Sequence, residues 1–240
     1  MSPNPPSFLH HLQTEGYHPR SNKHSNALAE AILNDLVTYC PEIAQKAAAG
    51  QIVYDLNFNV SVGTTDWNID LVIGLAPLGM NPPEPPMKIT RTHPASVQVA
   101  VEIKSVMTEH RKAIKNRKRD FEAHHIHAHQ YNSKIIAGGV LVLNASTTFR
   151  SPLRPDITTH RNPQNLILHC INEMKSVGSS GGIIGEQGLD AKAVVVVDSD
   201  NIDLSDTSYV VSKPAPPMGD PVHYDAFIQK ICELYRMRFT

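Results

Sequence analysis

The sequence predicts an α/β fold with a mixed central β-sheet flanked by helices. Two valine- and isoleucine-rich segments, 96–104 and 135–143, are typical of strands, and a long helical segment, 109–132, lies between them. A strand, a helix and a second strand in succession imply a crossover that leaves the two strands parallel. An earlier pair of strands separated by a short turn predicts a hairpin, so the sheet is expected to be mixed.

The first 75 residues contain signals for two helices and this hairpin. Residues 1–24 are rich in Pro, His and Asn and predict an arm with little core to bury. The next segment carries apolar residues at i+4 spacing, begins at Ser25 or Asn26 as a plausible cap and is ended by Pro41. The elements expected here span residues 25–40 and 42–49 as helices, and 52–62 and 67–75 as strands.

The rest of the chain is organised around the predicted crossover. The proline-rich segment 78–94 is expected to be a loop, since proline cannot sit in a central strand. Segment 146–162 is polar and interrupted by prolines, and a glycine-rich loop follows near 178–188. The remaining expected elements are helices at 164–175 and 225–236 and a strand at 191–198.

Composition limits the function classes without selecting one. The 240-residue chain is 41% hydrophobic and 19% charged, with a net charge of −1, so no overall basicity indicates nucleic acid, although a local patch is enough for binding. Its three cysteines are far apart and argue for a reducing compartment and against a disulfide framework. The N-terminus is neither basic nor apolar, and no apolar run reaches membrane-spanning length. The expected location is the cytoplasm, with no membrane partner.

Two carboxylates and a lysine stand inside the predicted strands. Asp70 lies within the apolar run 67–73, and Glu102 and Lys104 end the strand 96–104. A charged residue there is costly unless it is paired, solvated or bound to an ion. Because residues i and i+2 of a strand share a face, Glu102 and Lys104 are expected to point the same way, together with Gln98.

These residues and this order of elements resemble the PD-(D/E)XK nuclease superfamily, which has the type II restriction endonuclease-like fold. The resemblance covers roughly residues 25–145 of a single nuclease domain expected over 25–240, with recognition and dimerisation elements in 146–240. It implies that Asp70 is the first acid of the motif, Glu102 the second and Lys104 its lysine. Ile69 precedes Asp70, so the proline of the motif is absent.

The resemblance also implies further site residues and a cofactor. Glu30 is the candidate for an additional acid from the first helix, and Gln130 for a polar helix residue directed at the site. The implied cofactor is Mg²⁺, for which Mn²⁺ can substitute. Asp70, Glu102 and the carbonyl of Ile103 offer the hard oxygen ligands that Mg²⁺ prefers, and Lys104 would position the attacking water and offset negative charge. The alternative is structural: Glu102 and Lys104 form an exposed pair on a sheet edge, and Asp70 is a solvated acid.

Basic residues near the predicted site are candidates for contacts with the DNA backbone. A run of positive charge opens the helix after Lys104, a smaller basic group precedes the first helix, and two arginines lie in the polar loop. Solvated surface is the competing explanation for each group. The predicted DNA-binding residues are Arg20, Lys23, His24, Arg111, Lys112, Lys115, Arg117, Lys118, Arg154 and Arg161.

Four histidines, at 124, 125, 127 and 129, invite a zinc interpretation, but the sequence has neither the HExxH glutamate nor a cysteine pair to complete such a site. We expect packed or partly exposed histidines instead.

The leading hypothesis is a Mg²⁺-dependent type II restriction endonuclease acting on double-stranded DNA. A palindromic target would require a homodimer, and a cognate DNA methyltransferase would protect the host. One alternative is a structure-directed repair or recombination nuclease. Another is a non-catalytic DNA-binding module on the same fold.

Overall fold

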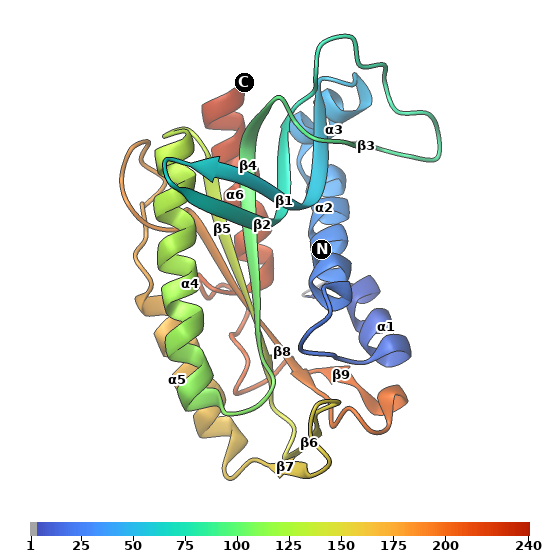
Figure 1. Cartoon of the computed structure of the whole chain (residues 1–240), viewed down its shortest axis with the longest axis vertical. Helices are drawn as coiled ribbons and strands as arrows, with labels where there is room; N and C mark the ends of the chain where they lie inside the picture. Colours follow the sequence, from blue (N-terminus) through green and yellow to red (C-terminus); the bar gives the residue numbers. More distant parts are fainter. Residues whose placement is uncertain (1–3) are drawn as a thin grey trace.

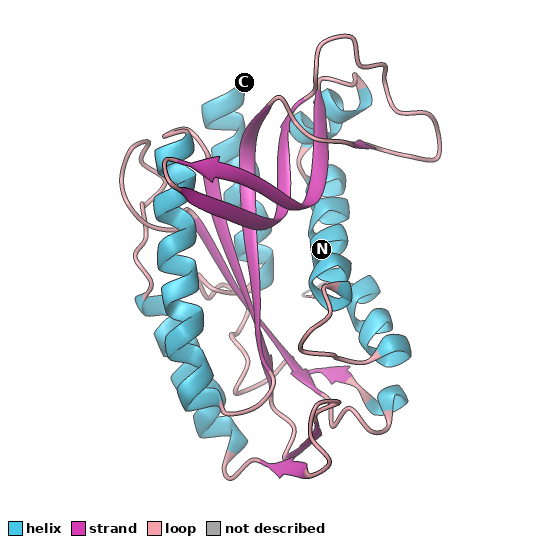
Figure 2. Ribbon diagram, viewed as in Figure 1, coloured by secondary structure: helices cyan, strands magenta, loops and turns pink. Residues whose placement is uncertain are grey.

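The central sheet has seven strands in the order β3-β1-β2-β4-β5-β8-β9, and helices lie on both of its faces (Figures 1 and 2). The structure is a computed structural model, and it describes residues 4–240. The strands of this sheet are β1 (Ile52–Val62), β2 (Thr65–Leu75), β3 (Thr90–Arg91), β4 (Ser96–Val106), β5 (Ile136–Asn144), β8 (Ala191–Asp198) and β9 (Ser208–Tyr209). The helices are α1 (Pro6–Glu15), α2 (Lys23–Tyr39), α3 (Pro41–Ala48), α4 (His110–Tyr131), α5 (Pro163–Ser176), α6 (Tyr224–Phe239) and the short 3-10 helix η1 (Leu204–Asp206).

The predicted α/β class and its mixed sheet are confirmed. β4 and β5 pair in parallel from Val99↔Ile136 to Val106↔Leu143, with α4 as the connection, and β8 adds a third parallel strand. β2 pairs antiparallel with β1 on one side and with β4 on the other. The carboxyl ends of β4, β5 and β8 therefore meet at one edge of the sheet.

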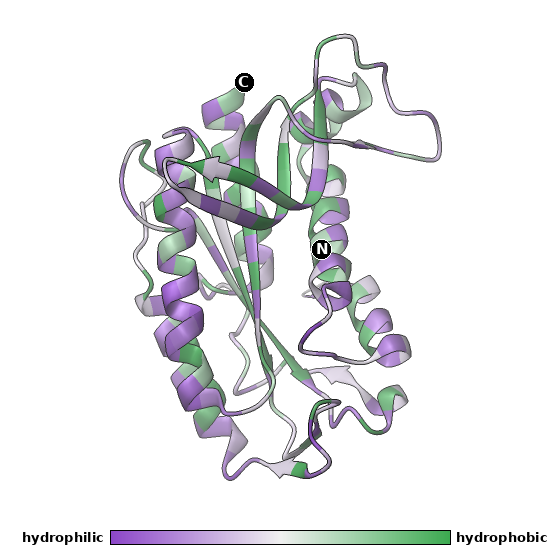
Figure 3. Ribbon diagram, in the orientation of Figure 1, coloured by the Kyte–Doolittle hydropathy of each residue, from purple (hydrophilic) through white to green (hydrophobic). Residues whose placement is uncertain are grey.

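Each face of the sheet is covered by its own hydrophobic cluster. The first cluster joins α1, α2, α3 and α6 to the strands through residues such as Ile32, Val101 and Ile231. The second joins α4 and α5 to the opposite face through residues such as Phe121 and Met174. Figure 3 shows the apolar strands between the helices, whereas much of the surface of α4 is hydrophilic. Within residues 4–240, none of the helices combines the length and the apolar character needed to cross a membrane.

The β1–β2 hairpin passes from one face of the sheet to the other. Near its base, Leu71 packs in the first cluster, whereas Trp67 and Ile69 pack in the second. The hairpin changes face at Asn57, which has a φ of 53°. Here the paired residues of β1 and β2 pass from Leu56↔Leu71 to Phe58↔Ile69, and Asn57 and Asp70 are left out of the ladder. The outer half of the hairpin consequently curves across toward α4 (Figure 1).

Two expectations for the N-terminal half are wrong in detail. Within the expected arm, α1 buries Phe8 and Leu12 in the first cluster. α2 begins at Lys23 rather than after Ser25 or Asn26, and its N-cap residue is Asn22, which makes no side-chain capping bond. The apolar spacing identified the buried stripe of α2 but did not fix its first turn.

Short strands account for most of the elements that the sequence did not predict. The polar segment 146–162 contains a two-stranded hairpin, β6 (Thr148–Arg150) and β7 (Ile157–Thr159). β3 and β9 lie at the two edges of the main sheet and have two residues each. Strands of two or three residues leave no periodicity for a sequence pattern to reveal.

Two of the three cysteines are paired. Cys40, between α2 and α3, forms a disulfide with Cys232 of α6, with their Cα atoms 5.2 Å apart. The expectation that these widely separated cysteines form no disulfide is therefore wrong, since the fold brings residues 192 positions apart into contact. Cys170 is free and buried, and burial raises the pKa of its thiol to about 12.

A buried ion pair joins α6 to the amino ends of β5 and β8. The side chains of Arg238 and Asp190 are 2% and 0% exposed, with Nη2 and Oδ1 2.6 Å apart. Asp190 also accepts from the amide of Ala137 and the hydroxyl of Ser180, and Arg238 donates to the carbonyl of Ile135. All of these bonds lie away from solvent, so removing either charge leaves the other without compensation.

Asp190→Asn is expected to lower the free energy of unfolding by about 3–5 kcal/mol, because it leaves the Arg238 guanidinium buried without its counter-charge. Equilibrium urea denaturation measures the change. Glu233→Gln on α6 is the matched control, since it removes only a surface pair with Lys230 and is expected to leave the stability unchanged. Equal stabilities for Asp190→Asn and the natural protein would contradict the assigned role of the pair.

Candidate active site

Asp70 and Glu102 lie on neighbouring strands, at the point where the ladder between them ends. The recorded β2–β4 pairs run from Leu75↔Ser96 to Leu71↔Val101. Beyond that point the amide of Ile103 donates to Oδ2 of Asp70 at 2.7 Å. If the ladder continued, a backbone carbonyl of β2 would accept this hydrogen bond. The carboxylate of Asp70 accepts it instead, and the bond holds Asp70 beside β4. Lys104 forms an ion pair with Glu102.

The charges of the site are partly buried and close enough to shift one another. Burial and then the charge of Asp70 raise the pKa of Glu102 to about 7. Burial also raises the pKa of Asp70, against the opposing effects of the Ile103 amide and Lys104. Burial acts to lower the pKa of Lys104, but the carboxylates of Glu102 and Asp70 outweigh it and the pKa is raised. The site therefore contains two acids and one ammonium group, that of Lys104, which offsets part of their negative charge.

His124 of α4 and Trp67 of β2 form a buried wall beside Glu102. Nε1 of Trp67 donates to Nδ1 of His124 at 3.3 Å, and Nε2 of His124 donates to the carbonyl of Ala100 at 3.3 Å. Burial lowers the pKa of His124 to about 3, so the ring is neutral at pH 7. Its Nδ1 lies 3.9 Å from Oε2 of Glu102, where a neutral imidazole contributes shape but no charge.

α4 also supplies a third acid and an arginine near the site. The charge of Asp120 raises the pKa values of both Glu102 and Lys104, which places this carboxylate near the pair. Arg117 donates from Nη1 to Oδ2 of Asp120 at 2.8 Å, and its buried Nε has no partner. Arg117, Asp120 and His124 recur at i, i+3 and i+7, so helical spacing from Arg117 could have identified this face.

The N-terminal turn of α2 forms the opposite side of the site. Ser25 acts on the pKa of Asp70, and Asn26 accepts a hydrogen bond from Asn57 at 2.9 Å. Glu30, the expected additional acid, is exposed further along α2 and lies near Tyr54, whose pKa is raised by burial and then by the Glu30 charge. Glu30 is not among the charges acting on Asp70 or Glu102. These contacts do not decide whether Glu30 supplies an additional acid, and that role stays a prediction.

Neither predicted glutamine reaches the site. The β2–β4 register shifts by one residue between Ile73 and Gly74, opposite the segment 97–99 of β4, which turns Gln98 to the other face. There Oε1 of Gln98 accepts from the hydroxyl of Tyr235 at 2.7 Å, so it does not share a face with Glu102 and Lys104. Gln130 is exposed six residues after His124, about 240° around the helix from it.

The remaining predicted metal ligand, the carbonyl of Ile103, is not tested by these contacts. The side chain of Ile103 packs in the first cluster, and its amide holds Asp70. Its role as an oxygen ligand stays a prediction.

The predicted basic residues divide into three groups. Arg111, Lys112 and Arg161 are exposed and line one pocket at the carboxyl edge of the sheet. Others already have partners: Lys23 pairs with Glu15, Arg154 lies 3.9 Å from Glu109, Arg117 pairs with Asp120, and Lys118 contacts Glu173 and Ser176 of α5. Arg20 and Lys115 are exposed.

His24 does not belong to the basic group that we predicted before α2. It packs against Tyr17 with ring centroids 4.5 Å apart, and burial lowers its pKa to about 4. It is therefore uncharged at pH 7 and adds no positive charge for a phosphate.

Two of the α4 histidines have a structural explanation. Nδ1 of His125 accepts from the amide of Gly188, and Nε2 of His129 donates to the carbonyl of the same glycine at 3.1 Å. The i, i+4 pair therefore fastens the glycine-rich loop to α4. This supports the expectation of packed histidines over a zinc site.

The two acids at the end of the β2–β4 ladder suit a magnesium ion that keeps most of its water. Within residues 4–240 no group of three or more His, Cys, Asp or Glu side chains is arranged to hold a metal ion. Mg²⁺, however, is commonly bound by one or two carboxylates together with waters and substrate phosphate. Asp70 and Glu102 provide two carboxylates in a site where their mutual repulsion would be relieved by a cation. The donor set thus fits the implied cofactor.

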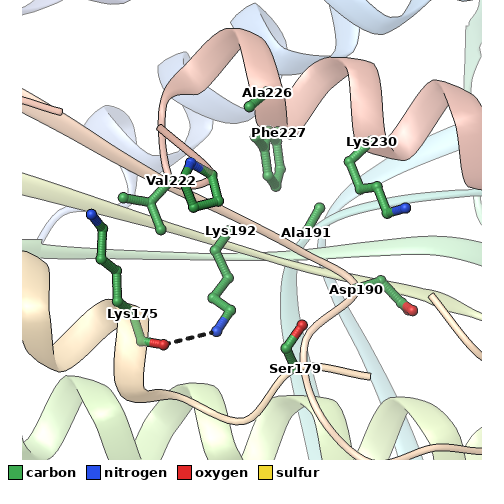
Figure 4. Close-up of a pocket in the computed structure, with 10 residues that line it drawn as sticks. Lys175, Ser179, Asp190, Ala191, Lys192, Val222, Ala226, Phe227 and Lys230 are labelled. Carbon is green, nitrogen blue, oxygen red and sulfur yellow. Dashed lines mark hydrogen bonds between the residues drawn. The ribbon is translucent and has the colours of Figure 1, made fainter. Parts of the chain in front are cut away.

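A second pocket at the amino edge of β8 is lined by lysines (Figure 4). Each ammonium group there has a partner: Lys192 donates to the carbonyls of Lys175 and Val177, Lys175 pairs with Asp220, and Lys230 with Glu233. Lys192 thereby satisfies carbonyls at the end of α5. The pocket is on the edge of the sheet opposite the carboxyl ends of the parallel strands and is not part of the candidate site.

No protein-family model, curated protein or solved structure matches this chain. The function is therefore inferred from the geometry of the residues above.

Glu102 is expected to titrate near pH 7 in the metal-free protein, because burial and the charge of Asp70 oppose its ionisation. Its protonated form favours the folded state, so its contribution to stability is complete below its ordinary pKa of 4.5 and is lost as pH rises through about 7. NMR titration of the glutamate side-chain carboxyl carbons measures the pKa directly.

Asp70→Asn removes the neighbouring charge and is expected to lower the pKa of Glu102. Asp66→Asn is the matched control, since Asp66 lies on the same strand and bonds only to Ser61 in the exposed turn. A Glu102 pKa that is identical in all three proteins would contradict the proximity of the two acids.

Proposed function

We propose that this protein is a Mg²⁺-dependent phosphodiester hydrolase that cleaves DNA. The observation that carries the proposal is the placement of Asp70, Glu102 and Lys104 together at the end of the β2–β4 ladder, with the Ile103 amide fixing Asp70. A surface ion pair does not need a second acid held next to it. A buried carboxylate, that of Glu102, beside the partly buried carboxylate of Asp70 favours a cation site over the purely structural alternative.

Asp70 and Glu102 would hold the metal ion, with the carbonyl of Ile103 as a third oxygen. When bound, the ion would supply charge for the non-bridging phosphate oxygens and acidify a water. Lys104 would orient the attacking water and offset the negative charge that develops on the phosphate oxygens. Glu102 would release its proton to solvent when the cation replaces that proton.

The surroundings favour an anionic polymer as substrate. Arg117 flanks the acids on α4, and Arg111, Lys112 and Lys115 continue along the same helix toward its exposed N-terminal end. A backbone with regularly spaced phosphates would be attracted along this line. Double-stranded DNA is the substrate that we propose on these grounds.

Several finer expectations stay predictions. They are sequence-specific cleavage by a type II restriction endonuclease, a homodimer that matches a palindromic site, protection by a cognate DNA methyltransferase, Mn²⁺ as a substitute for Mg²⁺, and a cytoplasmic location. A structure-directed nuclease would use the same acids on branched or nicked DNA. A non-catalytic DNA-binding module would keep the fold and retain DNA without cutting it.

Purified protein is expected to cleave unmethylated phage DNA with Mg²⁺ and not with EDTA. Discrete bands on a gel would support sequence-specific cleavage, and a smear would favour the structure-directed alternative. Intact DNA with Mg²⁺ and with Mn²⁺, accompanied by DNA retention, would overturn the hydrolase proposal in favour of the binding module.

Asp70→Asn and Lys104→Ala are each expected to reduce the cleavage rate at least about 100-fold. Asp70→Asn removes a negative charge that would hold the metal ion, and Lys104→Ala removes the positive charge that would offset charge on the reacting phosphate. The controls Asp66→Asn and Lys88→Ala change the same residue types at exposed positions outside the site and are expected to cleave at the natural rate. Unchanged cleavage by Asp70→Asn would show that the site is elsewhere.

A further inference from the structure

Beyond its bend at Asn57, the β1–β2 hairpin has one apolar face and one polar face. We call this outer half, residues 58–69, the ribbon (Figure 1). The apolar side chains, which pack in the second hydrophobic cluster together with those of α4, are Phe58, Val60, Val62, Trp67 and Ile69. Because the side chains of a strand alternate between its two faces, the residues between them point away from α4. These residues are Asn59, Ser61, Asp66 and Asn68, and all four are exposed.

Asn59 and Asn68 form a pair of neighbouring amides on the polar face, which we call the amide pair. They lie directly opposite each other in the β1–β2 ladder, where the Cβ atoms of two strands are about 5 Å apart. Ser61 and Asp66, the other two residues of this face, bond to each other at 2.9 Å. Within residues 4–240, neither side chain of the amide pair makes a hydrogen bond. Their donors and acceptors are therefore open to a ligand.

Asparagine is an unusual residue at regular strand positions, since it is depleted in β-sheets. Asn57 has a structural reason: it adopts a φ of 53°, and its side chain bonds to those of Asn22 and Asn26 at the start of α2. Asn59 and Asn68 occupy regular positions of the ladder and make no such bonds. Folding of the hairpin does not account for them, which favours a role in binding.

The polar face of the ribbon begins beside the candidate active site. Asn68 is two residues from Asp70 on β2, a distance of about 7 Å along a strand. The nucleotides of a DNA strand rise about 3.4 Å per step along the duplex. With a phosphate held at Asp70 and Glu102, the amide pair would lie about two base pairs from the cleaved bond.

The ribbon has no positive charge of its own. The segment 52–75 contains neither lysine nor arginine, so it adds nothing to the attraction of a phosphate backbone. The exposed basic residues Arg111, Lys112 and Lys115 lie on α4 instead. This division matches protein–DNA interfaces, in which contacts to phosphates position the duplex and contacts to bases specify the sequence.

We propose that the ribbon enters the major groove of DNA and that the amide pair recognises adenine close to the cleaved bond. The proposal rests on the proposed function, which supplies double-stranded DNA as the substrate. The major groove is about 12 Å wide and admits a two-stranded ribbon. A carboxamide can accept a hydrogen bond from N6 of adenine and donate one to its N7, and adenine alone presents this donor and acceptor together on one base in that groove.

Selection from a library of random DNA duplexes tests the amide pair without cleavage. In EDTA, the natural protein is expected to enrich a sequence motif that contains adenine. The double variant Asn59→Ala/Asn68→Ala is expected to retain DNA, because the basic residues of α4 are intact, but to lose the preference for adenine. Asn172→Ala, at an exposed position of α5, is the control and is expected to enrich the natural motif.

Two results of the selection would overturn the proposal. One is that the natural protein retains DNA without enriching any motif. The other is that the double variant enriches the same motif as the natural protein.

Replacement of adenine by 7-deazaadenine tests the contact directly, because it removes the N7 acceptor and leaves base pairing intact. Fluorescence anisotropy with a duplex of the enriched sequence measures the affinity. At the selected adenines, the replacement is expected to weaken binding of the natural protein about ten-fold and to leave binding of the double variant unchanged. Equal weakening for both proteins would contradict the contact.

Selection and cleavage are separate measurements, so the two proposals can fail independently. A motif that depends on the amide pair, without cleavage in Mg²⁺ or Mn²⁺, would contradict the hydrolase and support recognition by the ribbon. Cleavage of DNA by a protein whose selection is unaffected by the double variant would support the hydrolase and overturn recognition by the ribbon.

Discussion

The hydrogen bond from the Ile103 amide to Asp70 is the contact on which the candidate site depends. It stands where the β2–β4 ladder stops, so a side chain rather than a backbone carbonyl continues the connection between the strands. An unpartnered amide there would be costly, and the carboxylate that satisfies it is thereby held close to Glu102. One bond thus joins the two strands and sets the spacing of two acids whose repulsion is visible in the raised pKa of Glu102.

The bend of the hairpin explains why this site is lined from both layers of helices. At Asn57 and Asp70 the β1–β2 ribbon leaves the face covered by α2 and continues onto the face covered by α4. Its base contributes residues to the first hydrophobic cluster, and its outer half contributes Trp67 to the second. Ser25 approaches Asp70 from one side while His124 approaches Glu102 from the other.

The sequence was most informative where several residues repeat one pattern. The valine-rich strands and the apolar stripe of α4 were predictable, as were the three charged residues that interrupt the strands. Gln98 was misplaced because a one-residue register shift reverses the face of a strand. Asp120 was missed, although its i+3 spacing from Arg117 marks the face of α4 that also carries His124. The Cys40–Cys232 pair likewise depends on a contact across 192 residues.

The N-terminal segment before α2 is fastened to residues that lie far along the sequence. Gln13 donates to the carbonyl of Thr207, the amide of Tyr17 donates to Asn201, and the hydroxyl of Tyr209 donates to the carbonyl of Pro5. The segment that leads into α2, and hence one wall of the site, is therefore supported by residues 184 to 204 positions further along the sequence. Contacts of such long range form only after a large loop has closed. During folding, this wall of the site is consequently completed after the local hairpin that carries Asp70.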